Sequence, residues 1–347
     1  MRLLTPGPVM ISEDARKTLS MQVVSHRSSD YRKLHKHAVE GLRRVLGLDD
    51  WIILLIPGSG TTAVDSMAWS LAPGKRVLAL VWGEFGRRLA DTLRRAGAIV
   101  DVLEAPPGSV IDPEDAAEHA KNYDIVALVH NETGTGVRYP WIKELADVLD
   151  GQALIVDSVS AAGAEETPMH DNIAAYATCT HKALAAPPGL GIVALNPQWL
   201  RLLEERRAEP PPSIDLAKYI KFAGKDETPF TPPVNVVAAL GAAVDLVNEI
   251  GVDKYRRMHE ARSSILYTSP GLEFLPDKPE TRSRTVVAVK TPGRATEVKK
   301  ALMDKGILVA TGMGELKNDI VRVGVMGYIR DEWIQEAARV IRETLSS

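Results

Sequence analysis

The spacing of apolar residues along the chain changes several times between a helical and a strand-like pattern. Between Asp30 and Leu46 apolar residues recur every three or four positions, which predicts an amphipathic helix that ends at Gly47. A short apolar run over Trp51–Ile56 predicts a buried strand, and helical spacing returns after the glycine-rich turn at 57–61. This part of the chain is therefore expected to fold as helix, strand, glycine turn and helix.

The same alternation continues for about another hundred residues. Apolar strands that alternate with helices of about ten residues are typical of a mainly parallel sheet covered on both faces. Such sheets bind ligands at the carboxyl ends of their strands, so chemically important residues are expected just after strands. The predicted strands are Arg76–Val81, Val100–Leu103, Ile125–His130 and Ala153–Val156, and the predicted helices are Gly86–Ala96, Pro113–Lys121 and Trp141–Leu149.

The pattern changes in the last third of the chain. A charged, proline-bearing stretch over Glu204–Pro233 interrupts the alternation, and one long helical pattern follows over Val234–Leu266. A boundary near Gly251 divides the chain into a large domain of residues 15–250 and a small domain of residues 1–14 and 251–347. The small domain is expected to be α+β, with strands at Thr285–Val289, Ile307–Ala310 and Ile320–Val325 and helices at Ala295–Lys305 and Glu332–Leu345.

Composition excludes several classes of protein. With 347 residues, 45% hydrophobic and 25% charged, the chain is an ordinary globular protein and is neither disordered nor fibrous. A net charge of −3 gives no basic field for nucleic acid, and no apolar run approaches the roughly 20 residues that span a membrane. One cysteine and no secretory leader pattern predict a reducing, cytoplasmic location, without a metal cage. Seven Asn and four Gln are few, which favours a heat-adapted source.

The first candidate for chemistry is the turn Gly58-Ser59-Gly60-Thr61, between a predicted strand and a predicted helix. Free backbone N–H groups and the positive helix end at such a place suit an anion. A tight turn with a helix cap explains the same residues without any ligand. The turn matches neither the Walker loop nor the dinucleotide fingerprint, so a phosphate bound here is not expected to belong to ATP or NAD.

Two further residues carry a stronger signal. Asp157 directly follows the strand Ala153–Val156, and Lys182 lies among small and apolar residues. A cap or turn would explain Asp157 alone, but burial of an unpaired ammonium is costly, and buried lysines of lowered pKa form Schiff bases. An anion site, a carboxylate for a ring nitrogen and a lysine for an aldehyde together indicate pyridoxal phosphate.

At this point the sequence resembles the class V, fold-type I pyridoxal-phosphate aminotransferases, and within them the alanine–glyoxylate and serine–pyruvate aminotransferase branch. The resemblance covers nearly the whole chain, and the order and spacing of its motifs are specific. It implies a large α/β domain with a mainly parallel seven-stranded sheet and a smaller α+β C-terminal domain. The motifs are Thr5-Pro6-Gly7-Pro8, Ser25-His26-Arg27-Ser28, Gly58-Ser59-Gly60-Thr61, Phe85-Gly86-Arg87-Arg88, His130-Asn131-Glu132-Thr133-Gly134, Asp157-Ser158-Val159-Ser160, His181-Lys182-Ala183-Leu184, Thr231-Pro232-Pro233-Val234 and Arg322-Val323-Gly324.

The resemblance implies a role for each candidate residue. Lys182 would form the internal aldimine and move the proton in catalysis, and Asp157 would pair with the pyridine nitrogen. The cofactor would be held by Ser59, Gly60 and Thr61 at its phosphate, by Phe85 stacked on its ring, and by Thr133, Thr180, His181 and Thr231. Arg322 would bind the substrate α-carboxylate beside the Gly7 backbone. Alone, Phe85 could equally be a core residue, and Arg322 could be half of a structural ion pair.

The implied activity is transfer of an amino group from alanine, serine or aspartate to glyoxylate or pyruvate. Two departures from the family pattern make the assignment to one branch of the family less specific. His181 stands where the branch commonly has Gln, and the segment before Thr231 lacks a Tyr found in mammalian-type relatives. If Thr231 reaches the phosphate of a neighbouring subunit, as in family members, a homodimer with shared active sites follows. A 2-aminoethylphosphonate-type transaminase and a class V lyase remain alternatives, whereas a cysteine desulfurase is disfavoured because Cys179 stands beside Lys182.

Overall fold

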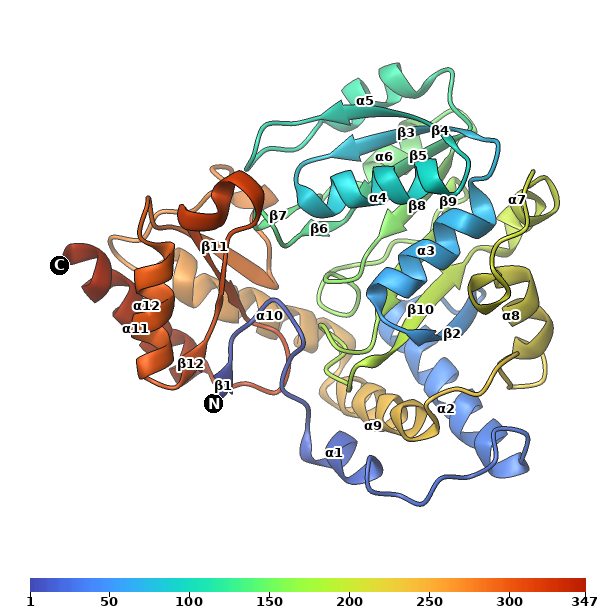
Figure 1. Ribbon diagram of the computed structural model, residues 1–347, viewed down its shortest axis with the longest axis horizontal. Coiled ribbons are helices and arrows are strands. Elements are labelled where there is room, and N and C mark those ends of the chain that lie inside the picture. Colours follow the sequence, from blue (N-terminus) through green and yellow to red (C-terminus); the bar gives the residue numbers. More distant parts are fainter.

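The computed structural model describes all residues, 1–347, and consists of a large α/β domain beside a smaller α+β domain (Figure 1). The large domain is built on a seven-stranded sheet with the order β2-β10-β9-β8-β5-β3-β4. Only β10 runs antiparallel to its neighbours, so the prediction of a mainly parallel seven-stranded sheet is confirmed. The strands are β2 (Ile52–Gly58), β3 (Arg76–Val81), β4 (Ile99–Glu104), β5 (Ile125–Val129), β8 (Ala153–Asp157), β9 (Ile173–Cys179) and β10 (Gly189–Leu195).

Helices cover both faces of this sheet, as its largely apolar, buried inner strands require. One face packs against α2 (Ser29–Leu46), α5 (Pro113–Ala120), α6 (Ile142–Val148) and α9 (Val234–Ile250), which share a buried cluster with the strands. The other face packs against α3 (Gly60–Leu71), α4 (Glu84–Arg95), α7 (Arg201–Glu204) and α8 (Leu216–Ala223). A short helix α1 (Glu13–Thr18) lies against α9, and a small hairpin of β6 (Asn131–Glu132) and β7 (Val137–Arg138) follows β5.

The small domain carries both ends of the chain (Figure 1). Its antiparallel sheet has the order β11-β14-β13, and β1 (Arg2–Leu3) pairs in parallel with β12 (Ile307–Leu308). Leu4 belongs to the buried cluster of this domain, and the bounds near residues 14 and 251 stay a prediction. The remaining elements are β11 (Val286–Lys290), β13 (Ala310–Thr311), β14 (Ile320–Gly324), α10 (Val252–Tyr267), α11 (Ala295–Asp304) and α12 (Asp331–Ser346).

The prediction of one helix over Val234–Leu266 is wrong. Gly251, with φ of +91°, ends α9, and the chain bends by 89° before α10 begins. Apolar spacing continues through the bend, so periodicity alone could not reveal it. No single helix is long and apolar enough to cross a membrane, although this bent pair passes that test when its two helices are counted together.

The sequence analysis also did not predict several other elements, among them α8 and β9. The stretch Glu204–Pro233 was predicted only to interrupt the alternation, but it contains α8, whose N-terminus is capped by the Asp215 side chain. Strand β9 is formed by Ile173–Cys179, whose small residues gave no clear strand pattern. This strand matters for the site because it leads directly to Lys182.

Candidate active site

The carboxyl ends of the parallel strands meet at one edge of the large sheet. Strand β8 ends at Asp157, whose carbonyl accepts a hydrogen bond from the His130 N–H at 2.9 Å, just after β5. The Ser158 N–H donates to the carbonyl of Ala177 in β9 at 2.8 Å. These links place the segments after β5, β8 and β9 side by side, where a parallel α/β sheet binds its ligands.

Lys182 lies in the turn that follows β9 and meets the amino-terminal segment of the chain. Its Nζ donates to the carbonyl of Pro6 at 2.6 Å. A Cβ on Gly7, which has φ of +129°, would lie 2.6–2.7 Å from the end of the Lys182 side chain. Burial lowers the pKa of Lys182, while the nearby Asp157 opposes that shift. The structure therefore brings Lys182 and Gly7 together, and the lysine has the environment of a nucleophilic amine.

Asp157 is almost fully buried at the end of β8. Its Oδ1 accepts the Val159 N–H at 3.0 Å, and its Oδ2 accepts no hydrogen bond from the chain. Burial raises the pKa of Asp157 to about 6, although Val159 N–H, Arg88 and Lys182 oppose the shift. A buried carboxylate with one unused oxygen is suited to bind a protonated ring nitrogen.

Replacement of Asp157 by Asn is expected to change how the stability of the cofactor-free protein depends on pH. The folded-state pKa of about 6 lies above the unfolded value of 3.8, so the folded protein holds this proton more tightly. The stability that Asp157 contributes is therefore complete below pH 4 and is lost as the pH rises through 6. In urea unfolding, the free energy of unfolding of the Asn variant should increase relative to that of the wild type as the pH rises, by up to about 3 kcal/mol at pH 7. A difference that stays constant between pH 4 and pH 7 would contradict this account.

The predicted phosphate loop forms the start of α3. The Thr62 hydroxyl accepts the Ser59 N–H at 3.0 Å, and the next N–H groups belong to the helix's first turn, which has no acceptor within the helix. A Cβ on Gly60 would lie 2.7 Å from Val159 Cγ1, so this turn packs directly on the segment after Asp157. Thr61 is exposed, and Ser59 is half-buried. The geometry suits an anion at the helix end, and phosphate binding by Ser59, Gly60 and Thr61 stays a prediction.

Phe85 lies in the first turn of α4, and the guanidinium of Arg88 lies 4.8 Å from its ring centroid. It is only partly buried, at the edge of the cluster that α4 makes with the sheet. Thr133, which is 3% exposed, follows β6 and is linked to Arg322 through its carbonyl. Stacking by Phe85 and a cofactor contact from Thr133 stay predictions.

The three other residues predicted to bind the cofactor differ in whether their polar atoms are free. Thr180 is fully buried, and its hydroxyl already donates to the Pro187 carbonyl at 2.6 Å. His181 Nδ1 is buried without a partner, and burial lowers the pKa of His181 to about 4. Thr231 is exposed in a surface groove that includes Val23 and His26. A cofactor contact is therefore open to His181, whereas Thr180 is occupied in holding its turn.

Arg322 comes from β14 of the small domain and is 9% exposed. Its Nε donates to the Thr311 carbonyl at 2.7 Å, and its Nη1 donates to the Thr133 carbonyl at 3.1 Å. No carboxylate lies within 4 Å, so the structural ion pair considered as an alternative is not formed. Burial without such a partner lowers the pKa of Arg322, and the group keeps Nη2 free for an anion.

The amino-terminal segment connects Arg322 with Lys182. Two residues beyond Arg322, the Gly324 N–H donates to the Leu4 carbonyl at 2.8 Å. Two residues beyond Leu4, the Pro6 carbonyl accepts from Lys182. The amino-terminal segment thus links a guanidinium suited to a carboxylate with an amine of lowered pKa, and the two charges are close enough for Arg322 to help lower the pKa of Lys182.

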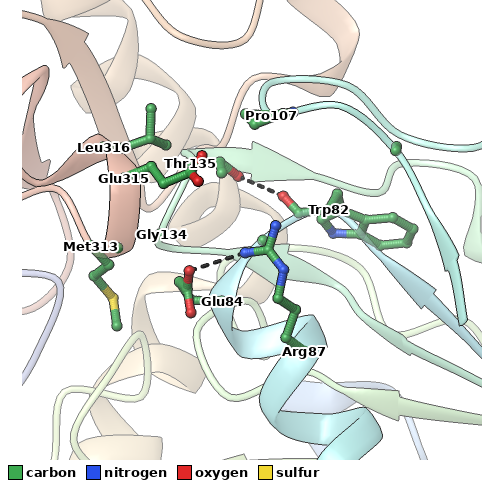
Figure 2. A pocket seen from close by; sticks show the side chains of 12 residues that line it. Trp82, Glu84, Arg87, Pro107, Gly134, Thr135, Met313, Glu315 and Leu316 are labelled. Carbon is green, nitrogen blue, oxygen red and sulfur yellow. Dashed lines mark hydrogen bonds and ion pairs between the residues drawn. The ribbon is translucent and has the colours of Figure 1, made fainter.

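A cavity of about 380 Å³ lies between the start of α4 and residues 313–316 of the small domain (Figure 2). Figure 2 shows Arg87 paired with Glu84 on α4, opposite Met313 and Glu315. Both carbonyls that hold Arg322 lie close in sequence to the cavity wall, because Thr133 precedes Gly134 and Thr311 precedes Met313. Arg322, Lys182 and Asp157 themselves do not line this cavity.

Glu132 is a buried residue of the site for which sequence reasoning gave no role. Its side chain is 0% exposed, and it accepts three backbone hydrogen bonds from two different segments. In the sequence it is only a member of the motif His130-Asn131-Glu132-Thr133-Gly134, three residues after an apolar strand, where a solvated loop could also have a glutamate.

A cofactor with a phosphate, an aldehyde and a ring nitrogen fits these residues. The start of α3 suits the phosphate, Lys182 the aldehyde, and the unused Oδ2 of Asp157 the ring nitrogen. The fold and the site together define a fold-type I pyridoxal-phosphate enzyme.

Comparison with known proteins identifies the family. The family model described as "Aminotransferase class-V" matches residues 14–331. An uncharacterized aminotransferase of Methanocaldococcus jannaschii is 35% identical over 94% of this chain and 87% of its own length. The L-aspartate–glyoxylate aminotransferase of Paracoccus denitrificans is 29% identical over 95% of this chain and 87% of its own. The crystal structure of a subgroup IV aspartate aminotransferase from Thermus thermophilus superposes with a TM-score of 0.91, at 30% identity, over 100% and 99% of the two chains. The chain belongs to the class V aminotransferases, which are pyridoxal-phosphate-dependent enzymes.

Proposed function

We propose that this aminotransferase moves the amino group of alanine, serine or aspartate to glyoxylate or pyruvate. The observation that carries the proposal is Arg322, a buried guanidinium without a carboxylate partner whose charge acts on Lys182. A desolvated arginine with free donors binds a carboxylate strongly, and every α-amino acid and 2-oxo acid carries one. Arg322 therefore orients donor and acceptor in turn at the same place.

The chain's own residues divide the work of the reaction. Pyridoxal phosphate, when bound, would supply the electron sink that makes the substrate Cα–H acidic. Lys182, with its lowered pKa, would take up and return the proton of the substrate Cα. Asp157 would keep the ring nitrogen protonated, and Phe85 would fix the plane of the ring. The first turn of α3 would hold the phosphate.

The paired arginines of the site favour a small donor. Arg27 and Arg138 are the arginines that could bind a second, distal carboxylate. Each already has a carboxylate partner, since Arg27 pairs with Glu227 at 2.7 Å and Arg138 pairs with Glu165 at 3.1 Å, although both glutamates also pair with another arginine. Alanine and serine need no second arginine. Aspartate stays among the donors because one relative and one similar structure are described as acting on aspartate.

The alternatives predict different substrates. A 2-aminoethylphosphonate transaminase would use that amine and no α-amino acid, which would leave Arg322 without its carboxylate. A class V lyase would bind the cofactor but would not convert it with these donors. Cys179 does not support a desulfurase, because it is fully buried and burial raises the pKa of its thiol to about 12.

A panel of donors and acceptors tests the proposal. Purified, cofactor-loaded protein is incubated with alanine, serine, aspartate or 2-aminoethylphosphonate, each with glyoxylate or pyruvate, and the products are quantified by mass spectrometry. We expect glycine or alanine to form from the oxo acid with at least one of the three α-amino acids. Turnover of 2-aminoethylphosphonate alone would replace the proposal by the first alternative.

We also propose a homodimer in which Thr231 contributes to the partner's phosphate site. Thr231 is exposed, and its loop is held in place by Arg27, which donates to the Thr228 and Pro229 carbonyls at 2.8 and 3.1 Å. Exposed apolar side chains lie nearby at Val23 and Phe230, as an interface would require. The free, buried Cys179 is compatible with a cytoplasmic location.

Replacement of Thr231 by Val tests this arrangement. Loss of one phosphate hydrogen bond is expected to weaken cofactor binding about fivefold to tenfold, while sedimentation still shows a dimer. Thr268→Val, an exposed hydroxyl that bonds only within α10, serves as the control. A monomeric wild-type protein with full activity would contradict the shared site.

A further inference from the structure

Glu132 is enclosed by backbone N–H donors from two segments. Its Oε2 accepts from Phe85 N–H at 2.8 Å and from Gly86 N–H at 3.1 Å, at the start of α4. Its Oε1 accepts from Gly134 N–H at 2.8 Å, in the turn of the β6–β7 hairpin. One carboxylate therefore caps α4 and fastens the hairpin to it.

Two glycines make room for this carboxylate. A Cβ on Gly83 would lie 2.5 Å from Glu132 Cγ, and a Cβ on Gly134 would lie 2.8 Å from Oε1. A Cβ at either position would force the side chain or the backbone to move. The Glu132 pocket is thus closely fitted on both sides, and a buried carboxylate with three donors fixes its neighbours strongly.

The two segments that Glu132 joins lead to different parts of the site. Phe85, whose N–H it binds, is the residue expected to stack on the cofactor ring. Thr133, the next residue in the chain, uses its carbonyl to hold Arg322 Nη1 at 3.1 Å. The hairpin is anchored to the small domain as well, because the Ser283 N–H donates to the Gly136 carbonyl at 3.0 Å.

We propose that Glu132 is a positioning residue that sets Phe85 and Arg322 relative to each other, so that the ring plane and the substrate carboxylate keep one fixed geometry. Glu132 is bonded neither to the Phe85 ring nor to the Arg322 guanidinium. It acts through the backbone N–H of Phe85 and through the carbonyl of Thr133, the next residue. This inference rests on the proposed roles of Phe85 and Arg322. It adds a residue that couples cofactor orientation to substrate binding across the two domains.

The test compares three variants of the cofactor-loaded protein. Glu132→Gln keeps the shape of the side chain but presents an amide to at least one N–H donor. Gly134→Ala presses on the same carboxylate without removing its charge. Asp91→Asn is the matched control, because Asp91 is an exposed carboxylate of α4 that only pairs with Arg94.

Two measurements separate positioning from general stability. The circular dichroism of the bound cofactor in the visible range reports the orientation of its ring. The rate at which a donor converts the visible cofactor band, measured without oxo acid at several donor concentrations, gives the donor affinity and the conversion rate constant separately. With alanine, serine and aspartate tried in turn, Glu132→Gln should change the dichroism and weaken donor binding about tenfold. Gly134→Ala should do the same to a smaller extent, and Asp91→Asn should do neither.

Each result decides the matter. If Glu132→Gln folds and keeps wild-type dichroism and donor affinity within twofold, the inference is wrong. If Glu132→Gln does not fold, an unchanged Gly134→Ala variant overturns it in the same way. Arg322→Gln separates this failure from that of the proposed function, because unchanged donor affinity in that variant would remove the role of Arg322 itself.

Discussion

Replacement of Lys182 by Ala is expected to lower kcat by at least about 10⁴-fold, because the chain loses both its covalent attachment to the cofactor and its proton carrier. Lys182 is a largely buried amine, and burial lowers its pKa, which favours the neutral form that can act as a base. Steady-state assays with the best donor of the panel measure the loss. Borohydride reduction followed by peptide mass spectrometry should show the cofactor on the Lys182 peptide of the wild type only.

Lys143→Ala is the control for the loss of a lysine. Lys143 is exposed on α6, where its only partner is Asp147 at 2.8 Å, and its removal should leave activity unchanged. Full transaminase activity in the Lys182→Ala variant would show that the catalytic assignment is wrong.

Replacement of Arg322 by Gln is expected to weaken donor and acceptor binding about 100-fold, while cofactor affinity changes less than about twofold. The buried guanidinium has no carboxylate partner in the chain, so its charge is available to the substrate. Gln is a shorter side chain without charge, so the substitution removes the expected ion pair between Arg322 and the substrate carboxylate without filling the space. Donor affinity comes from single-turnover conversion of the cofactor band, and cofactor affinity comes from titration of the cofactor-free protein.

Arg339→Gln provides the matched control, because Arg339 is an exposed residue of α12 that pairs only with Glu343. Its substitution should change neither affinity. Equal losses of donor and cofactor affinity in Arg322→Gln would instead indicate that Arg322 has a structural role.

The main residues of the site could be predicted because each carries a signal in its own sequence neighbourhood. Asp157 ends an apolar strand, Lys182 follows small residues that leave no partner for its charge, and Arg322 interrupts an apolar strand. The alternation of strands and helices then indicates which ends of the strands meet. In the structure Asp157 and Arg322 are both close enough to Lys182 to act on its pKa.

Other features depend on contacts between distant segments and gave no local signal. Glu132 acquires its role only because the start of α4, 46–47 positions earlier, turns its N–H groups toward the end of β5. Gly251 bends the chain where the apolar pattern is continuous, so the predicted single helix concealed α9 and α10. Pro6 was recognised only as part of a motif, yet its carbonyl binds Lys182 Nζ across 176 positions.

The visible spectrum of the purified protein, recorded before and after each donor is added without oxo acid, tests the central claim most directly. The account predicts a yellow band from bound pyridoxal phosphate that alanine, serine or aspartate converts to the pyridoxamine form. The donor that converts the band is thereby identified. A protein that stays colourless after incubation with pyridoxal phosphate, or a yellow band that none of these donors changes, would contradict the account.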